Sequence, residues 1–158
     1  MAMLTLLSAL VMAATQPLPK AEPLPPPDFS DKQILDAIQA VLVTLEQGDG
    51  PALLTLVYPD GRVTPRGTLA SGFTGLRSSS WSEYAARMKP GAGFIERIAN
   101  PVIEQDDDVA MVWASFTIER NGKIVSCGMD HFDLVREAGQ WKLMNLTFSS
   151  RVTGCPGQ

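Results

Sequence analysis

The 158-residue sequence contains a single histidine and two cysteines, and it has no cluster of basic side chains. Its 13 lysines and arginines are outnumbered by 17 aspartates and glutamates, which gives a net charge of −4 and argues against a nucleic-acid-binding surface. No CxxC or HExxH spacing occurs, so we expect neither a metal site nor a cofactor. Internal repeats at a spacing of 20–50 residues are also missing, which excludes a solenoid.

The first 28 residues are expected to precede the folded domain. Residues 1–14 are apolar and end in small residues, as a secretory signal peptide does, and this run is too short to span a bilayer. A buried helix is the alternative. Residues 15–28 are rich in proline, which fixes φ and removes backbone donors, so they predict an extended tether. We therefore expect a periplasmic or secreted protein with one domain over residues 29–158 and no stable membrane span in the mature form.

Apolar spacing and turn residues predict the elements in the first part of this domain. In chain order they are a helix from Ser30 to Gly48, a short helix over 49–57, a short strand over 61–68, a Gly/Ser-rich loop over 71–80, a helix that begins with the capping box Ser80-Trp-Ser-Glu83 and ends at Pro90-Gly91, and an extended segment over 94–104 with a kink at Asn100-Pro101.

The last third of the chain predicts two consecutive β-hairpins. Asn121-Gly122 favours a two-residue type I′ turn, and Ala138-Gly139 is expected to form the second turn. With these turns, His131 faces Val112 on one side and Leu146 on the other. The sheet face that we assign to the core and cavity then carries Val112, Ala114, Phe116, Ile118, Val125, Cys127, Met129, His131, Asp133, Met144, Leu146 and Phe148.

The order of elements and three segments resemble the NTF2-like, or cystatin-like, superfamily of α+β cones. The segments are Leu45–Leu54, Tyr58–Pro65 and Phe132–Leu143, which are similar to nuclear transport factor 2, SnoaL-like and DUF4440-type members. The resemblance implies a strongly bent antiparallel sheet wrapped around a long N-terminal helix, with a conical cavity. It does not imply one activity, because members with this fold catalyse different reactions or only bind a ligand or a partner.

His131 is the candidate general base, because it is expected among apolar neighbours on the cavity face. Asp133 lies on the same face and is placed to orient it, and Asp60 is a second candidate catalytic residue. The alternatives are a packed core histidine and an ordinary Pro-Asp-Gly turn. The residues expected to contact a ligand are Tyr58, Trp81, Tyr84, Phe116, Met129, His131 and Met144.

The two cysteines are expected to form a disulfide. The predicted register places Cys127 opposite Ser150, and Cys155 follows the strand end on a short tail that can fold back. An exported chain makes this bond plausible, whereas a cytosolic chain would carry two free thiols.

Three functions are compatible with these features. We favour an exported, non-catalytic domain that binds a small apolar molecule or a partner. The alternatives are a small lyase or isomerase similar to ketosteroid isomerase, scytalone dehydratase or polyketide cyclases, with His131 as base, and a structural module with a filled cavity. A homodimer is expected through an apolar outer sheet face that carries Trp113, Phe132, Leu134, Trp141 and Leu143.

Overall fold

The computed structural model describes residues 29–91 and 94–158, so the predicted signal peptide and tether lie outside the described residues. The elements in chain order are α1 (Phe29–Gln47), α2 (Gly50–Leu56), β1 (Arg62–Thr68), β2 (Thr74–Leu76), β3 (Ser79–Ser80), α3 (Trp81–Ala85), β4 (Ile95–Asp106), β5 (Val109–Arg120), β6 (Lys123–Glu137) and β7 (Gln140–Arg151).

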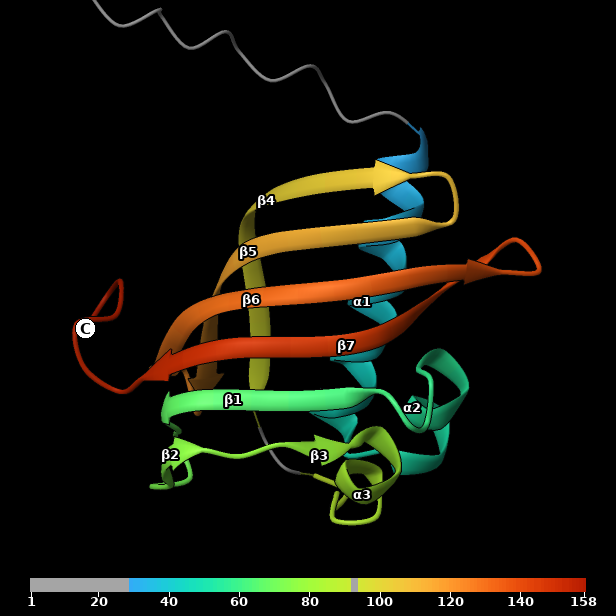
Figure 1. The fold of residues 1–158 in the computed structure, drawn as a ribbon. Coiled ribbons are helices and arrows are strands. Elements are labelled where there is room, and N and C mark those ends of the chain that lie inside the picture. The colour runs from blue at the N-terminus through green and yellow to red at the C-terminus, as the bar shows by residue number, and fades with distance from the viewer. Residues whose placement is uncertain (1–28, 92–93) are drawn as a thin grey trace, which may run out of the picture.

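The strands form one strongly bent sheet in the order β2-β1-β7-β6-β5-β4, with β3 paired to β1. Strands β4 to β7 are antiparallel neighbours, whereas β1 runs parallel to β7. In Figure 1 the helix α1 crosses one face of this sheet, and α2 and α3 gather at one end, beside β1 and β3. The concave face therefore encloses a space that is bounded by α1 and closed on one side by the short helices.

The core lies between α1 and the concave face of the sheet. Ile34 and Ile38 on α1 are 0% exposed, as are Val112 on β5 and Phe132 on β6. Each such side chain contributes about 1.5–3 kcal/mol when it leaves water. The predicted apolar stripe of the first helix is therefore the surface that the sheet wraps around.

The ends of the helices follow from local sequence signals. Gly48 ends α1 with a φ of +69°, and a Cβ at this position would lie 2.1 Å from the carbonyl oxygen of Lys89. Ser80 and Glu83 form the predicted capping box at α3. Two expectations were wrong: α3 ends at Ala85 rather than at Pro90, and the predicted loop over 71–80 contains the strands β2 and β3, which pair with β1.

The predicted register of the first hairpin is wrong by one residue. Its two-residue turn is confirmed, since Arg120 pairs with Lys123. A β-bulge next to the turn then leaves Val125 as an extra residue, so His131 faces Trp113 rather than Val112.

A second bulge shifts the pairing of β6 with β7. Glu137 pairs with Gln140 as expected, but the register changes at Met144, and His131 consequently faces Thr147 rather than Leu146. Because side chains alternate along a strand, one extra residue makes every side chain beyond it point to the opposite face of the sheet. The β6 residues that point inward are Ser126, Gly128, Asp130, Phe132 and Leu134, whereas Cys127, Met129, His131 and Asp133 point outward.

The predicted outer apolar patch is corrected for the same reason. Of its members only Trp113 is exposed, with 47% of its surface accessible, while Phe132, Leu134, Trp141 and Leu143 belong to the core. The large apolar side chains that the described residues expose near it are Val102, Val109 and Met111. The homodimer remains a prediction.

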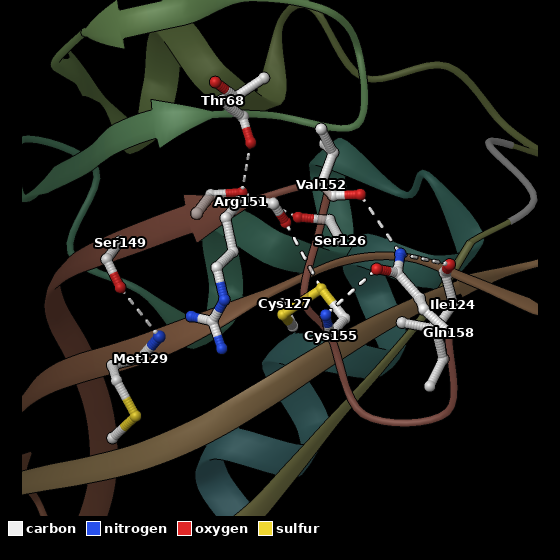
Figure 2. The surroundings of a disulfide bond; sticks show 11 residues. Thr68, Ile124, Ser126, Cys127, Met129, Ser149, Arg151, Val152, Cys155 and Gln158 are labelled. Atoms are coloured by element: carbon white, nitrogen blue, oxygen red, sulfur yellow. Dashed lines mark hydrogen bonds between the residues drawn. A yellow bond between two sulfur atoms is a disulfide. The ribbon is translucent and has the colours of Figure 1, made fainter.

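The predicted disulfide between Cys127 and Cys155 is confirmed, with a Cα–Cα distance of 5.7 Å (Figure 2). Cys127 lies opposite Arg151 rather than Ser150, one position from the expected register. Beyond the bond, the Gln158 side-chain amide donates to the backbone oxygen of Ile124 at 3.2 Å. The C-terminal tail is thus held on the outer side of the sheet by both covalent and polar contacts.

Removing the disulfide should destabilise the domain. The bond joins residues 28 positions apart, and closing such a loop stabilises by roughly 3–4 kcal/mol in the chain-entropy model. We expect Cys155→Ser to lower the melting temperature, and reductant to lower that of the parent but not that of the variant. Thiol titration of the natively extracted, unfolded parent checks the bond, and two free thiols would contradict it.

Candidate functional site

The concave side of the sheet holds two adjoining cavities. The larger has a volume of about 540 Å³ and the smaller of about 170 Å³. Pockets for small molecules typically have volumes of roughly 300–1,000 Å³, so the larger one suits a small organic ligand. The residues that line both cavities are Leu45, Val63, Leu69, Ser71, Tyr84, Phe94 and Phe148.

The two cavities differ in their polar residues. Arg77, Arg87 and Lys89 line the larger cavity and are exposed, so they form its rim. Glu96, which is partly buried, and Arg120, which is exposed, line the smaller cavity. The larger cavity therefore has cationic side chains at its rim, both cavities have apolar walls, and the Glu96 carboxyl group lies at the smaller one.

Glu96 is backed by a second carboxyl group, that of Asp130. Glu96 enters from β4 and Asp130 from the inward face of β6, and the two side chains are hydrogen-bonded to each other. Asp130 is only 1% exposed, and its Oδ2 has no hydrogen-bond partner among the described residues. Two carboxyl groups can share a hydrogen bond only when one of them keeps its proton.

Burial raises the pKa of both carboxyl groups. The pKa of Asp130 is raised further by the charge of Glu96 and by their hydrogen bond, whereas the same hydrogen bond opposes the rise of the Glu96 pKa. The pair therefore shares a proton, and the hydrogen bond favours the arrangement in which Asp130 donates it to the Glu96 carboxylate. The arrangement presents a partly desolvated, oriented carboxylate to the cavity.

Tyr84 supplies a neutral hydroxyl beside this pair. Burial, followed by the charge of Glu96, raises its pKa to about 12, against the opposing effect of Arg87 and Arg77. Its ring packs edge-on against Trp81 with 5.9 Å between the centroids. Tyr84 is consequently a hydrogen-bond donor rather than a base at physiological pH.

The sheet is closely packed next to the carboxyl pair. Gly128 lies two residues before Asp130 on the inward face of β6. A Cβ there would lie 1.9 Å from the carbonyl oxygen of Ser149 and 2.7 Å from the ring of Phe116. Only glycine fits at this position.

The structure places three of the predicted ligand-binding residues at the cavity. Trp81, Tyr84 and Phe116 line the smaller one. Trp81 is fully buried and donates from its indole nitrogen to the carbonyl oxygen of Met144 at 3.0 Å, which also anchors α3 on β7. Whether any of the three binds a ligand remains a prediction.

The predicted position of His131 on the cavity face was wrong, because the bulges turn it to the outer face. Its ring lies 6.0 Å from that of Trp113, and its Nε2 is 3.6 Å from the Asp133 carboxylate, so the two residues are neighbours on the outer face. The argument for His131 as a base within the cavity therefore no longer holds. Met129 lies on the same outer face.

The remaining predicted residues also lie away from the cavity lining. Met144 occupies the second bulge, and Asp60 is exposed in the turn after α2. Tyr58 packs beside Lys142, with the ammonium 5.7 Å from its ring centroid. Among residues 29–91 and 94–158, no three His, Cys, Asp or Glu side chains are grouped to hold a metal ion, and no helix is long and apolar enough to cross a membrane.

Sequence reasoning missed Glu96, Asp130 and the three rim cations. The sequence does contain one signal for Asp130. It alternates with apolar residues and therefore lies on the same face as Gly128, Phe132 and Leu134. The predicted register assigned that face to the outside. For Glu96 and the rim no local signal exists, because their association depends on the bend of the sheet.

Comparison with known proteins identifies the fold. No protein-family model and no curated protein matches the chain. A protein of unknown function with a cystatin-like fold from Nostoc punctiforme superposes with a TM-score of 0.64 at 15% identity, over 82% of this chain and 96% of that one. An NTF2-like protein from Cytophaga hutchinsonii gives 0.60 at 16% identity, over 78% and 99%. One from Novosphingobium aromaticivorans gives 0.60 at 14%, over 82% and 93%.

The chain therefore has the NTF2-like, cystatin-like fold, an α+β cone, as the resemblance of its sequence implied. At these identities the likeness establishes the fold alone. What the cavity does must be argued from its own residues.

The carboxyl pair predicts how stability depends on pH. Their pKa values are raised on folding, so from about pH 4, where free carboxyl groups ionise, the folded chain retains protons that the unfolded chain releases. We therefore expect the free energy of unfolding to fall as the pH rises from 4 towards 8. Asp130→Asn keeps a donor to Glu96 without the buried acid, and should melt roughly 5 °C above the parent at pH 8.

Thermal melts between pH 4 and pH 8 provide the measurement. Asp60→Asn, which replaces an exposed carboxyl group, is the matched control and should follow the parent. Parallel profiles for the parent and Asp130→Asn would show that the pair does not hold a proton in the folded state.

Proposed function

We propose that the domain binds a small, mainly apolar molecule in the cone, with a polar group of that molecule directed to Glu96. The observation that carries this proposal is the open cavity of about 540 Å³, which the described side chains leave unfilled. Apolar walls provide the free energy of binding, and a few placed polar groups provide the orientation. The open space favours this function over a structural module with a filled cavity.

We further propose that the protein works outside the reducing cytosol. The disulfide between Cys127 and Cys155 supports this, because such bonds persist in oxidising compartments. The apolar start of the sequence supports it independently. The thiol titration described above tests this part as well.

A substitution that narrows the cavity should weaken binding of an apolar probe. Leu69 lines both cavities from the loop after β1 and is only partly buried, so Leu69→Trp adds volume at a wall that can adjust. For 1-anilinonaphthalene, an uncharged fluorophore, we expect the dissociation constant to rise about tenfold, or 1.4 kcal/mol.

Leu76→Trp is the matched control, because Leu76 is 67% exposed on β2 and lines neither cavity. Fluorescence titration measures both variants beside the parent. If the parent does not bind the probe, or if both variants bind it equally well, the cone is not the binding site.

Proton abstraction is a second candidate function, favoured by the state of Glu96. A carboxylate whose pKa is raised by burial is a stronger base than a solvated one, and Tyr84 provides a neutral donor for a developing oxyanion. In this reaction Glu96 takes a proton from carbon next to a carbonyl group, and the bonding electrons move to the carbonyl oxygen. Glu96 thus replaces His131 as the candidate base.

Exchange of the α-protons of 2-tetralone with solvent deuterium, followed by NMR, tests this chemistry. The parent should accelerate exchange, and Glu96→Gln should reduce that acceleration by about 10²–10⁴-fold while retaining affinity for 1-anilinonaphthalene. Glu104→Gln, an exposed change on the same strand, serves as control. Equal rates with and without the parent protein would leave only the binding function.

A further inference from the structure

The charges of the cone are separated along its length. Arg77, Arg87 and Lys89 line the larger cavity, which no aspartate or glutamate lines among the described residues. Glu96 lines the smaller cavity, where the exposed Arg120 is the only cation among the described lining residues, and none of the three rim cations reaches it. The rim carries three positive charges although the chain as a whole has a net charge of −4.

The rim cations are not engaged in ion pairs within the described parts of the chain. None of the ion pairs found there involves Arg77, Arg87 or Lys89. Of the three, only Arg87 acts on the pKa of Glu83, which is lowered chiefly by the hydrogen bond to the Ser80 backbone and to a smaller extent by Arg62 and Arg87. Their charge therefore remains available to a ligand.

The rim is also held in place. Arg87 donates from Nη2 to the Ser79 hydroxyl at 3.0 Å, and the guanidinium of Arg77 stacks 4.1 Å from the ring centroid of Phe73. The segment that carries Lys89 is fixed to the end of α1, because the Gly91 amide donates to the carbonyl oxygen of Gln47 at 3.3 Å. Anchored cations lose less conformational entropy on binding an anion than mobile ones do.

We propose that the molecule bound in the cone is an amphiphilic anion, with its carboxylate, sulfonate or phosphate at the rim of Arg77, Arg87 and Lys89 and its apolar body inside. This inference rests on the proposed function and names the class of ligand. The charges fix the orientation, since the Glu96 carboxylate repels an anionic group from the inner end while the rim attracts it. The inner end then suits a hydroxyl or another hydrogen-bond donor.

Two fluorophores with the same rings, one uncharged and one with an added sulfonate group, test the inference. One is uncharged 1-anilinonaphthalene, and the other is 1-anilinonaphthalene-8-sulfonate, which has the same rings and an added anion. We expect the parent to bind the sulfonate about tenfold more tightly. Arg87→Gln/Lys89→Gln should remove that advantage and change the affinity for the uncharged probe by less than about threefold.

Three controls separate charge from structure. Arg87→Lys/Lys89→Arg exchanges the two cations and should keep the preference to within about threefold. Lys123→Gln lowers the net charge by one at an exposed hairpin turn that lines neither cavity, and should have no effect. Arg120→Gln removes the cation that lines the smaller cavity, and a loss of preference there would overturn the assignment to the rim.

The outcomes distinguish the two proposals. If the parent binds both probes equally, or if Arg87→Gln/Lys89→Gln leaves the preference intact, the inference is wrong and the proposed function stands. If neither probe binds, the proposed function is wrong, and the inference that rests on it is wrong as well. Raising the ionic strength should weaken binding of the sulfonate alone, because salt screens only the charged contact.

Discussion

The packing of α1 against the concave face of the sheet is the constraint on which the rest of the structure depends. A flat sheet would cover only one side of a helix, so the long strands must bend to bury Ile34, Ile38 and Val41. The bulges in β4, β6 and β7 provide that curvature by inserting extra residues into the ladder. The cavity is the part of the enclosed space that α1 does not fill.

The same bulges decide which chemistry lies inside. Beyond an inserted residue, side chains that would point inward point outward, and the reverse. On β6 this places Asp130 on the inward face and His131 on the outward face. A carboxyl group in this position is costly unless it keeps its proton or finds a partner. The association of Asp130 with Glu96 meets both needs at once, and it leaves Glu96 as the one acidic group that lines the inner end. The distribution of charge in the cone thus follows from the shape of the sheet.

Most of the fold was predictable from the sequence, because its signals are local. The stripe of α1, the turns at Asn121-Gly122 and Ala138-Gly139, the capping box of α3 and the kink near Asn100 depend on neighbouring residues and were confirmed. The bulges at Val125 and Met144 depend on how strands far apart in sequence curve together. Neither residue carries a bulge signal such as an internal glycine, so the faces of β6 were assigned wrongly.

The candidate site was less predictable for the same reason. Trp81, Tyr84 and Phe116 reach the cavity because their positions follow from a helix face and from a strand whose inward face was correctly assigned. Glu96 and Asp130 come from strands separated in the sheet by β5, and they meet only because the sheet bends. The rim cations come from the end of β2 and from the segment after α3, in a region where the short strands were not foreseen.

Gly128 has a consequence for how such a cone can diversify. Any side chain there would collide with the backbone of β7 and the ring of Phe116, so this position of β6 cannot accept a larger residue. The loop after β1, with Leu69 and Ser71, touches both cavities and is only loosely packed. Descendants of this chain would therefore acquire new ligands by changing that loop, while the strands beneath it stay the same.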